Sequence, residues 1–215
     1  MRKMSWLPVV AALSVLTPLA LIGAPTKAAA QAAAGHDVAA PTTAKPEDAQ
    51  TIMDAAYRVA RAEHKPVLVI FHATWCGWCK KLEAVMDRPE FRLAFNANYV
   101  IVTLDVLENG PKVASDENPG GLAIMKALGG EKSGLPFYAI LDAKGKKLAD
   151  SNVMPKDQNI GYPGSPEEIE AFGKILEKTA PKWKGDDRQK LITFLKENAP
   201  PTAPVLTPTP SAKTK

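Results

Sequence analysis

Both cysteines of this 215-residue chain lie in one short segment, and they are the residues best suited to chemistry. Cys76 and Cys79 stand two residues apart in the run W-C-G-W-C-K at positions 75–80. A thiolate is a strong nucleophile, and a helix N-terminus favours it because unpaired N–H groups and the helix dipole stabilise negative charge. If a helix begins at Cys76, the sulfur of Cys79 lies one turn later on the same face. A bridge across so few residues gains little loop entropy, so the pair suits reversible opening better than stapling of the fold.

Two other interpretations of the cysteine pair stay open. The pair can form a plain local disulfide in an exported protein. Alternatively, the two thiolates and His72 can hold a soft metal ion, although strand alternation does not fix the direction of His72. With two cysteines in the whole chain, a four-cysteine zinc site and a disulfide-dense scaffold are excluded.

The pattern around the cysteines predicts an α/β fold. The continuous apolar run 66–72 is typical of a strand buried on both faces, and a helix is predicted directly after it at 76–86. Alternating strands and helices indicate a parallel strand pair, and a hairpin turn at 143–146 adds an antiparallel strand. A polar loop is expected at 109–119. The other predicted helices span 47–64, 89–96, 121–128, 165–179 and 186–198, and the other strands span 99–106, 137–142 and 147–151.

The cysteine segment resembles the thioredoxin superfamily. The resemblance is carried by W-C-G-W-C-K after a buried strand and by G-L-P-F at 134–137, and it covers about 47–179. It implies a thioredoxin-like fold, a central mixed β-sheet flanked by helices, here with an extra C-terminal helix. The chain looks most like exported members with a long segment between the second core strand and a cis-proline, which here is 107–134.

The resemblance also implies roles for individual residues. Cys76 would attack a disulfide and form a mixed disulfide, and the more buried Cys79 would then resolve it. Pro136 would have a cis peptide bond beside the cysteines and leave the Leu135 backbone open to pair with a substrate chain. An ordinary trans proline at the start of a strand is the alternative for Pro136.

Trp75 and Trp78 flank the thiols and would form an apolar docking rim, although Trp75 can equally pack on the fold. The Gly77-Trp78 dipeptide is neither the Gly-Pro of typical reductases nor the Pro-His of strong oxidants. The redox direction is therefore open.

The chain departs from thioredoxins at the residue that handles protons. Thioredoxins proper carry a buried Asp six residues before the first cysteine, where this chain has Ile70. Glu83, one helical turn beyond Cys79, is a candidate for proton transfer, with a solvated helix residue as the alternative. His72 stands where thioredoxins have an aromatic; it either lowers the pKa of Cys76 when protonated or fills space, and the second is favoured.

The chain ends are predicted to lie outside the folded domain. Residues 1–30 have the order of a signal peptide, basic then apolar then small, with cleavage after Ala30 and an uncleaved anchor as the alternative. Residues 31–46 are interpreted as a flexible linker, and residues 199–215 as a Pro/Thr-rich disordered tail. The thioredoxin-like domain is then 47–198.

Charge and composition exclude several classes of protein. With 46% apolar and 23% charged residues, the chain is neither wholly disordered nor a polytopic membrane protein. Its net charge of +4 comes from the ends, because residues 47–198 hold 21 basic and 22 acidic residues. No basic stripe with interleaved aromatics is present, so a nucleic-acid partner is not expected.

We therefore expect a monomeric thiol–disulfide oxidoreductase in the periplasm or secreted, without cofactor or metal, with reduction of protein disulfides as the favoured direction. Because an export compartment is kept oxidising, a membrane-bound electron donor is expected as a partner. The alternatives are a disulfide oxidase or isomerase and, from another class, a redox-linked chaperone or soft-metal carrier. In that case 107–134 and the helix 186–198 would be partner surfaces, although plain structural elaboration of the fold is the favoured interpretation of both segments.

Overall fold

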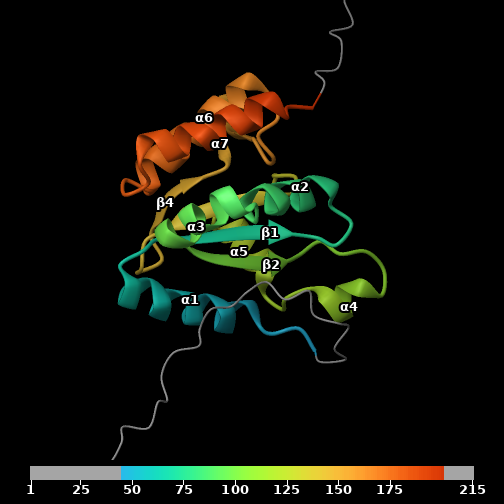
Figure 1. Cartoon of the computed structure of the whole chain (residues 1–215). Helices are drawn as coiled ribbons and strands as arrows, with labels where there is room; N and C mark the ends of the chain where they lie inside the picture. Colours follow the sequence, from blue (N-terminus) through green and yellow to red (C-terminus); the bar gives the residue numbers. More distant parts are fainter. Residues whose placement is uncertain (1–44, 201–215) are drawn as a thin grey trace, which may run out of the picture. The chain divides into compact units, whose positions relative to one another are not determined.

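A four-stranded mixed sheet lies at the centre of the computed structural model, which describes residues 45–200 (Figure 1). Its strand order is β2-β1-β3-β4. Strand β1 (Val67–His72) pairs in parallel with β2 (Val100–Asp105) and antiparallel with β3 (Phe137–Leu141), which pairs antiparallel with β4 (Lys147–Asp150). The predicted α/β fold with a parallel pair and an added hairpin is confirmed. The predicted signal peptide, most of the linker and the tail from residue 201 lie outside the described residues.

Helices cover both faces of this sheet because its central strands are apolar on both sides. Side chains alternate along a strand, so Val67, Val69 and Phe71 of β1 enter one core, and Leu68 and Ile70 enter the other. Helices α1 and α5 pack on the first side, and α2, α3, α6 and α7 on the second (Figure 1). Within residues 45–200, no helix is both long and apolar enough to cross a membrane. The helices are α1 (Ala49–Glu63), α2 (Gly77–Met86), α3 (Pro89–Asn98), α5 (Gly121–Ala127), α6 (Pro166–Thr179) and α7 (Gly185–Glu197).

Helix α6 begins at the capping box predicted from its sequence. The Ser165 hydroxyl accepts a hydrogen bond from the Glu168 backbone N–H at 3.2 Å, and the Glu168 carboxylate accepts one from the Ser165 N–H at 2.8 Å. Two orphan donors of the first helical turn are thereby satisfied. This fixes where the chain enters α6.

Two regions of the chain contain short elements that were not predicted. The expected loop 109–119 contains a one-turn helix, α4 (Lys112–Asp116), and the chain between β4 and α6 forms a small second sheet from β5 (Asn152–Met154) and β6 (Gln158–Asn159). A 3₁₀ turn, η1 (Pro155–Asp157), joins these two strands. Such short, polar segments show no periodic apolar pattern, and two-stranded hairpins are marginal without tertiary support.

Candidate active site

The cysteine pair lies where β1 gives way to α2. Cys76 is the N-cap residue of α2, and its sulfur accepts a hydrogen bond from the Cys79 N–H at 3.1 Å. The two sulfurs are bonded in a disulfide, with Cys76 4% exposed and Cys79 0% exposed. The helix begins one residue later than predicted. This placement aims the N-terminus of α2 at the Cys76 sulfur, where a negative charge is favoured.

The segment before β3 packs directly against the cysteines. The Leu135–Pro136 peptide bond is cis. Leu135 contacts the buried cluster formed by Ala73, Cys76 and Cys79. Because β3 pairs with β1, the residues before β3 arrive at the same edge of the sheet as the residues after β1. The structure thus brings together two sequence segments that the resemblance had linked.

Both tryptophans beside the cysteines are exposed, and each is held in place. Trp75 is 53% exposed, and its indole N–H donates a hydrogen bond to the Leu107 carbonyl at 2.8 Å. Trp78 is 46% exposed and stacks on Tyr162 with ring centroids 5.6 Å apart. The Lys81 ammonium lies 4.3 Å from the Trp78 ring centroid. Two large rings therefore flank the disulfide on the surface, and sequence reasoning had missed Tyr162.

His72 lies among carboxylates. Its Nδ1 is 2.7 Å from an oxygen of Asp105, its partner in the β1–β2 register. Its Nε2 is buried, makes no hydrogen bond to residues 45–200, and lies 3.8 Å from a Glu83 oxygen. The hydrogen bond to Asp105 raises the pKa of His72, burial opposes this, and the charges of Glu83 and Glu108 raise it further. His72 is thus an ionisable group with charged neighbours as well as a packed ring.

The structure places Ile70 and Glu83 differently with respect to solvent. Ile70 is 2% exposed and belongs to the apolar core beneath α2 and α3. The Glu83 side chain is 33% exposed and forms the ion pair with His72. Position 70 therefore supplies no proton acceptor, whereas Glu83 and His72 together bring two ionisable groups to the side of α2 that faces β1.

Sequence reasoning also missed a buried acid, Glu108. It is 6% exposed, and its carboxylate accepts hydrogen bonds from the backbone N–H and, at 2.9 Å, from the hydroxyl of Thr74. Lys112 donates to the same hydroxyl at 2.9 Å. Glu108 follows the carboxyl end of β2, which lies beside the carboxyl end of β1 in the parallel pair. This position after a predicted strand was the feature of the sequence that could have identified Glu108 as a neighbour of the cysteine loop. These bonds fasten the start of 107–134 to the loop that carries the cysteines.

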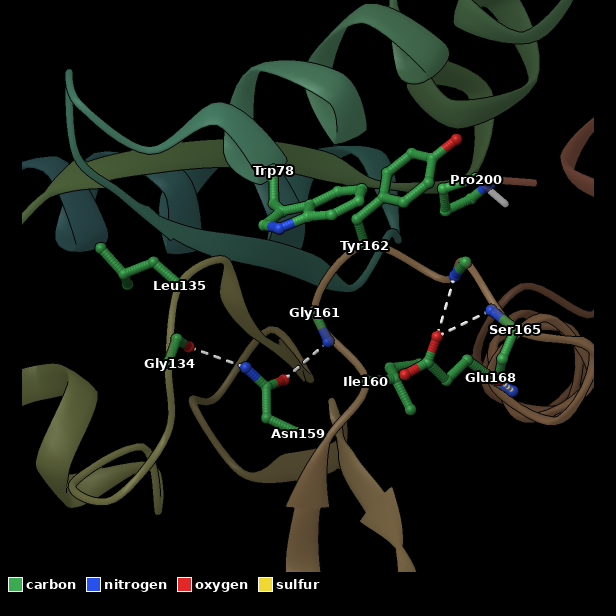
Figure 2. Close-up of a pocket in the computed structure, with 11 residues that line it drawn as sticks. Trp78, Gly134, Leu135, Asn159, Ile160, Gly161, Tyr162, Ser165, Glu168 and Pro200 are labelled. Atoms are coloured by element: carbon green, nitrogen blue, oxygen red, sulfur yellow. Dashed lines mark hydrogen bonds between the residues drawn. The ribbon is translucent and has the colours of Figure 1, made fainter. Parts of the chain in front are cut away.

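A cavity of about 410 Å³ opens beside Trp78 and Leu135. Figure 2 shows the Trp78 and Tyr162 rings on one side and the chain around Gly134 and Asn159 on the other. The cavity thus borders Leu135, which packs on the cysteine pair, and Trp78, which stands between the two cysteines in the sequence. Its remaining lining comes from Ile160, Gly161, Gly164, Ser165, Glu168 and Pro200. Among residues 45–200, no group of three or more His, Cys, Asp or Glu side chains is arranged to hold a metal ion.

Comparison with known proteins agrees with this geometry. A family model described as thioredoxin-like matches residues 48–143. The chain is 35% identical over 82 residues to a thioredoxin of Mycolicibacterium smegmatis. The aligned region covers 38% of this chain and 70% of that protein. The chain belongs to the thioredoxin superfamily.

Other superfamily relatives are longer or more distant. A protein disulfide-isomerase of Hordeum vulgare is 35% identical over 111 residues, 52% of this chain and 19% of that protein. This chain thus spans about a fifth of the length of that relative. Among solved structures, the disulphide isomerase from Xylella fastidiosa Temecula1 aligns with a TM-score of 0.42 at 20% identity, over 70% of this chain and 90% of that one.

Proposed function

We propose that this superfamily member is a periplasmic thiol–disulfide oxidoreductase that reduces disulfides of protein substrates. The carrying observation is the placement of Cys76 as the N-cap of α2, with the Cys79 N–H aimed at its sulfur and Cys79 one turn behind. A thiolate at Cys76 is stabilised there, and the resolving thiol is already within bonding distance.

The reaction proceeds by two thiol–disulfide exchanges. The Cys76 thiolate attacks one sulfur of the substrate disulfide; that bond breaks, and the leaving sulfur takes up a proton. Cys79 then loses its proton and attacks the Cys76 sulfur, which releases the second substrate thiol. Two electrons have passed to the substrate, and the protein is left with the Cys76–Cys79 disulfide of this structure.

Glu83 and His72 are the groups that we assign to the proton of Cys79, because position 70 carries Ile. Both lie on elements that also position the cysteines, and His72 Nε2 is buried with a carboxylate 3.8 Å away. The acidic neighbours of His72 raise its pKa, so the ring binds a proton more readily than a free imidazole does.

The substrate in this proposal is an extended polypeptide. Its backbone pairs with Leu135 beside Pro136, and its apolar side chains contact the rim formed by Trp75 and Trp78. Support comes from the exposure of both rings, 53% and 46%, at the border of the disulfide.

The proposed location requires a source of electrons. The basic, apolar and small residues of 1–30 support export, and the periplasm is kept oxidising, so a membrane-bound donor has to reduce the Cys76–Cys79 disulfide after each turnover. We propose that the protein acts as a monomer in this cycle.

Cysteine variants and the redox potential test this function. Reduced wild-type protein should reduce insulin disulfides, Cys76→Ser should lose this activity, and Cys79→Ser should lose turnover but accumulate mixed disulfides that mass spectrometry identifies. A potential of the cysteine pair near the thioredoxin value of about −270 mV supports the reducing direction, whereas about −120 mV would indicate an oxidase. Absence of trapped mixed disulfides in Cys79→Ser would refute the proposal.

A further inference from the structure

One side chain from the small second sheet reaches the backbone next to the disulfide. Asn159, in β6, donates through Nδ2 to the Gly134 carbonyl at 2.7 Å and to the Pro136 carbonyl at 2.9 Å. Its Oδ1 accepts a hydrogen bond from the Gly161 N–H at 3.0 Å. Figure 2 shows Asn159 between Gly134 and Gly161, at the edge of the cavity. Residues far apart in sequence are thereby joined by one amide group.

The chemistry of the amide makes this arrangement specific. An Asn side chain has two N–H donors and one carbonyl acceptor, and here the donors serve two carbonyls while the acceptor serves an N–H. A flipped amide would face donor to donor at Gly161, so the three contacts fix its orientation. The donor capacity of Asn159 is fully used on the backbone around Leu135.

The two bound carbonyls lie on either side of Leu135. Within residues 45–200, the N–H and C=O of Leu135 itself make no backbone hydrogen bond, and its side chain packs on Ala73, Cys76 and Cys79. The carbonyls of Gly134 and Pro136 are thus bound by Asn159, whereas the N–H and C=O of Leu135 remain available to pair with a substrate chain. A segment held at two points also loses less conformational entropy when a second chain binds to it.

We propose that Asn159 is a positioning residue for substrate binding, which holds the Gly134–Pro136 backbone so that Leu135 can pair with the substrate chain. The inference rests on the proposed function and extends it to the β5–β6 hairpin. Asn159 acts through Leu135 and takes no part in the exchange of bonds at the sulfurs. Its loss should weaken the binding of polypeptide disulfides and leave the chemistry of the cysteine pair unchanged.

The same hairpin supplies a matched control. Asn152, in β5, donates to the Gly129 carbonyl at 2.9 Å and accepts a hydrogen bond from the Ser133 hydroxyl at 2.8 Å. It therefore ties the same hairpin to the same connecting segment, but at residues that precede Leu135. Asn152→Ala removes hydrogen bonds of the same kind without freeing the carbonyls of Gly134 and Pro136.

Steady-state reduction of insulin tests the proposal, with the full chain kept reduced by a thiol donor in excess. Asn159→Ala should raise KM with little change in kcat, so that kcat/KM falls roughly tenfold, the size expected when two hydrogen bonds are lost. Asn159→Asp keeps the acceptor for Gly161 but has no N–H donors for the two carbonyls. Its kcat/KM should therefore fall by at least as much as that of Asn159→Ala. Asn152→Ala should stay within about twofold of wild type.

Two further readouts separate positioning from general damage. Reduction of a small aromatic disulfide, which needs no backbone pairing, and the redox potential of the cysteine pair in glutathione buffers should be the same in wild type and in both Asn159 variants. Equal KM values for Asn159→Ala and Asn152→Ala, or an equal loss with the small disulfide, would overturn the inference. Failure of the wild type to reduce insulin would instead overturn the proposed function. If Asn159→Ala does not fold, the Asp variant decides between these outcomes.

Discussion

At the scale of single residues, His72 is a half-buried ionisable ring that lies among acidic side chains. Its ring is hydrogen-bonded to Asp105 on β2 and faces Glu83 on α2, and Glu108 lies in the segment after β2. These three acids are the groups that raise the pKa of His72. Since the hydrogen bond to Asp105 and the two other charges raise that pKa, folding favours the protonated ring.

The raised pKa predicts a definite dependence of stability on pH. A group whose pKa is higher in the folded state stabilises the fold below its unfolded pKa of about 6.5, and this contribution disappears as pH rises through the folded pKa. The free energy of unfolding of the oxidised protein should therefore fall above pH 6.5, by about 1.4 kcal/mol for each unit of pKa difference.

Denaturant unfolding between pH 5.5 and 9 measures this dependence. His72→Gln should remove the fall, and Asp105→Asn should weaken it because it removes the largest cause of the raised pKa. An unchanged pH profile in His72→Gln would show that the ion pairs of His72 do not stabilise the fold.

At the scale of elements, the segment 107–134 is fastened to the cysteine loop by a few polar contacts. Glu108 binds the N–H and the hydroxyl of Thr74, and the indole of Trp75 binds the Leu107 carbonyl. The far end of the segment is fixed by packing: a Cβ at Gly130 would lie 2.6 Å from the Phe137 ring. The segment is thus held at both ends, and its start determines the position of Trp75.

Thr74→Val tests the attachment at Glu108. The variant keeps the size of the side chain but removes the hydroxyl that donates to a buried carboxylate and accepts from Lys112. We expect a loss of about 1–3 kcal/mol in the free energy of unfolding, because the Glu108 oxygen is left without its donor. Ser115→Ala, at an exposed hydroxyl bonded to Asp116, is the matched control and should change stability by less than about 0.5 kcal/mol. Equal losses in the two variants would contradict the assigned role of Glu108.

At the scale of the whole molecule, the cores on the two faces of the sheet are linked through β1, which contributes side chains to both. The extra helix α7 belongs to one of them. Phe194 contacts the Phe91 ring, with centroids 5.4 Å apart, and the Trp183 ring lies 4.9 Å from that of Phe95. The C-terminal helix is therefore part of the same packed unit as the helix that carries Cys79.

Leu191→Ala tests whether α7 shares the cooperative core. Leu191 is 0% exposed, so its truncation should cost about 2–5 kcal/mol and shift a single unfolding transition. Leu93→Ala, at a side chain that is 74% exposed, should cost little. Two separate transitions in chemical denaturation of the variant would show that α7 unfolds independently.

The spacing of the cysteines, the buried strand before them and the helix after them follow from sequence alone, because these features depend on residues close together in the chain. The tertiary structure decided the surroundings of the pair. His72 meets Asp105, Thr74 meets Glu108, and Asn159 meets the chain around Leu135, across sequence separations that local patterns do not encode. Hydrogen bonds between distant polar residues require both partners to be placed by the fold, whereas apolar periodicity records the burial of each element by itself.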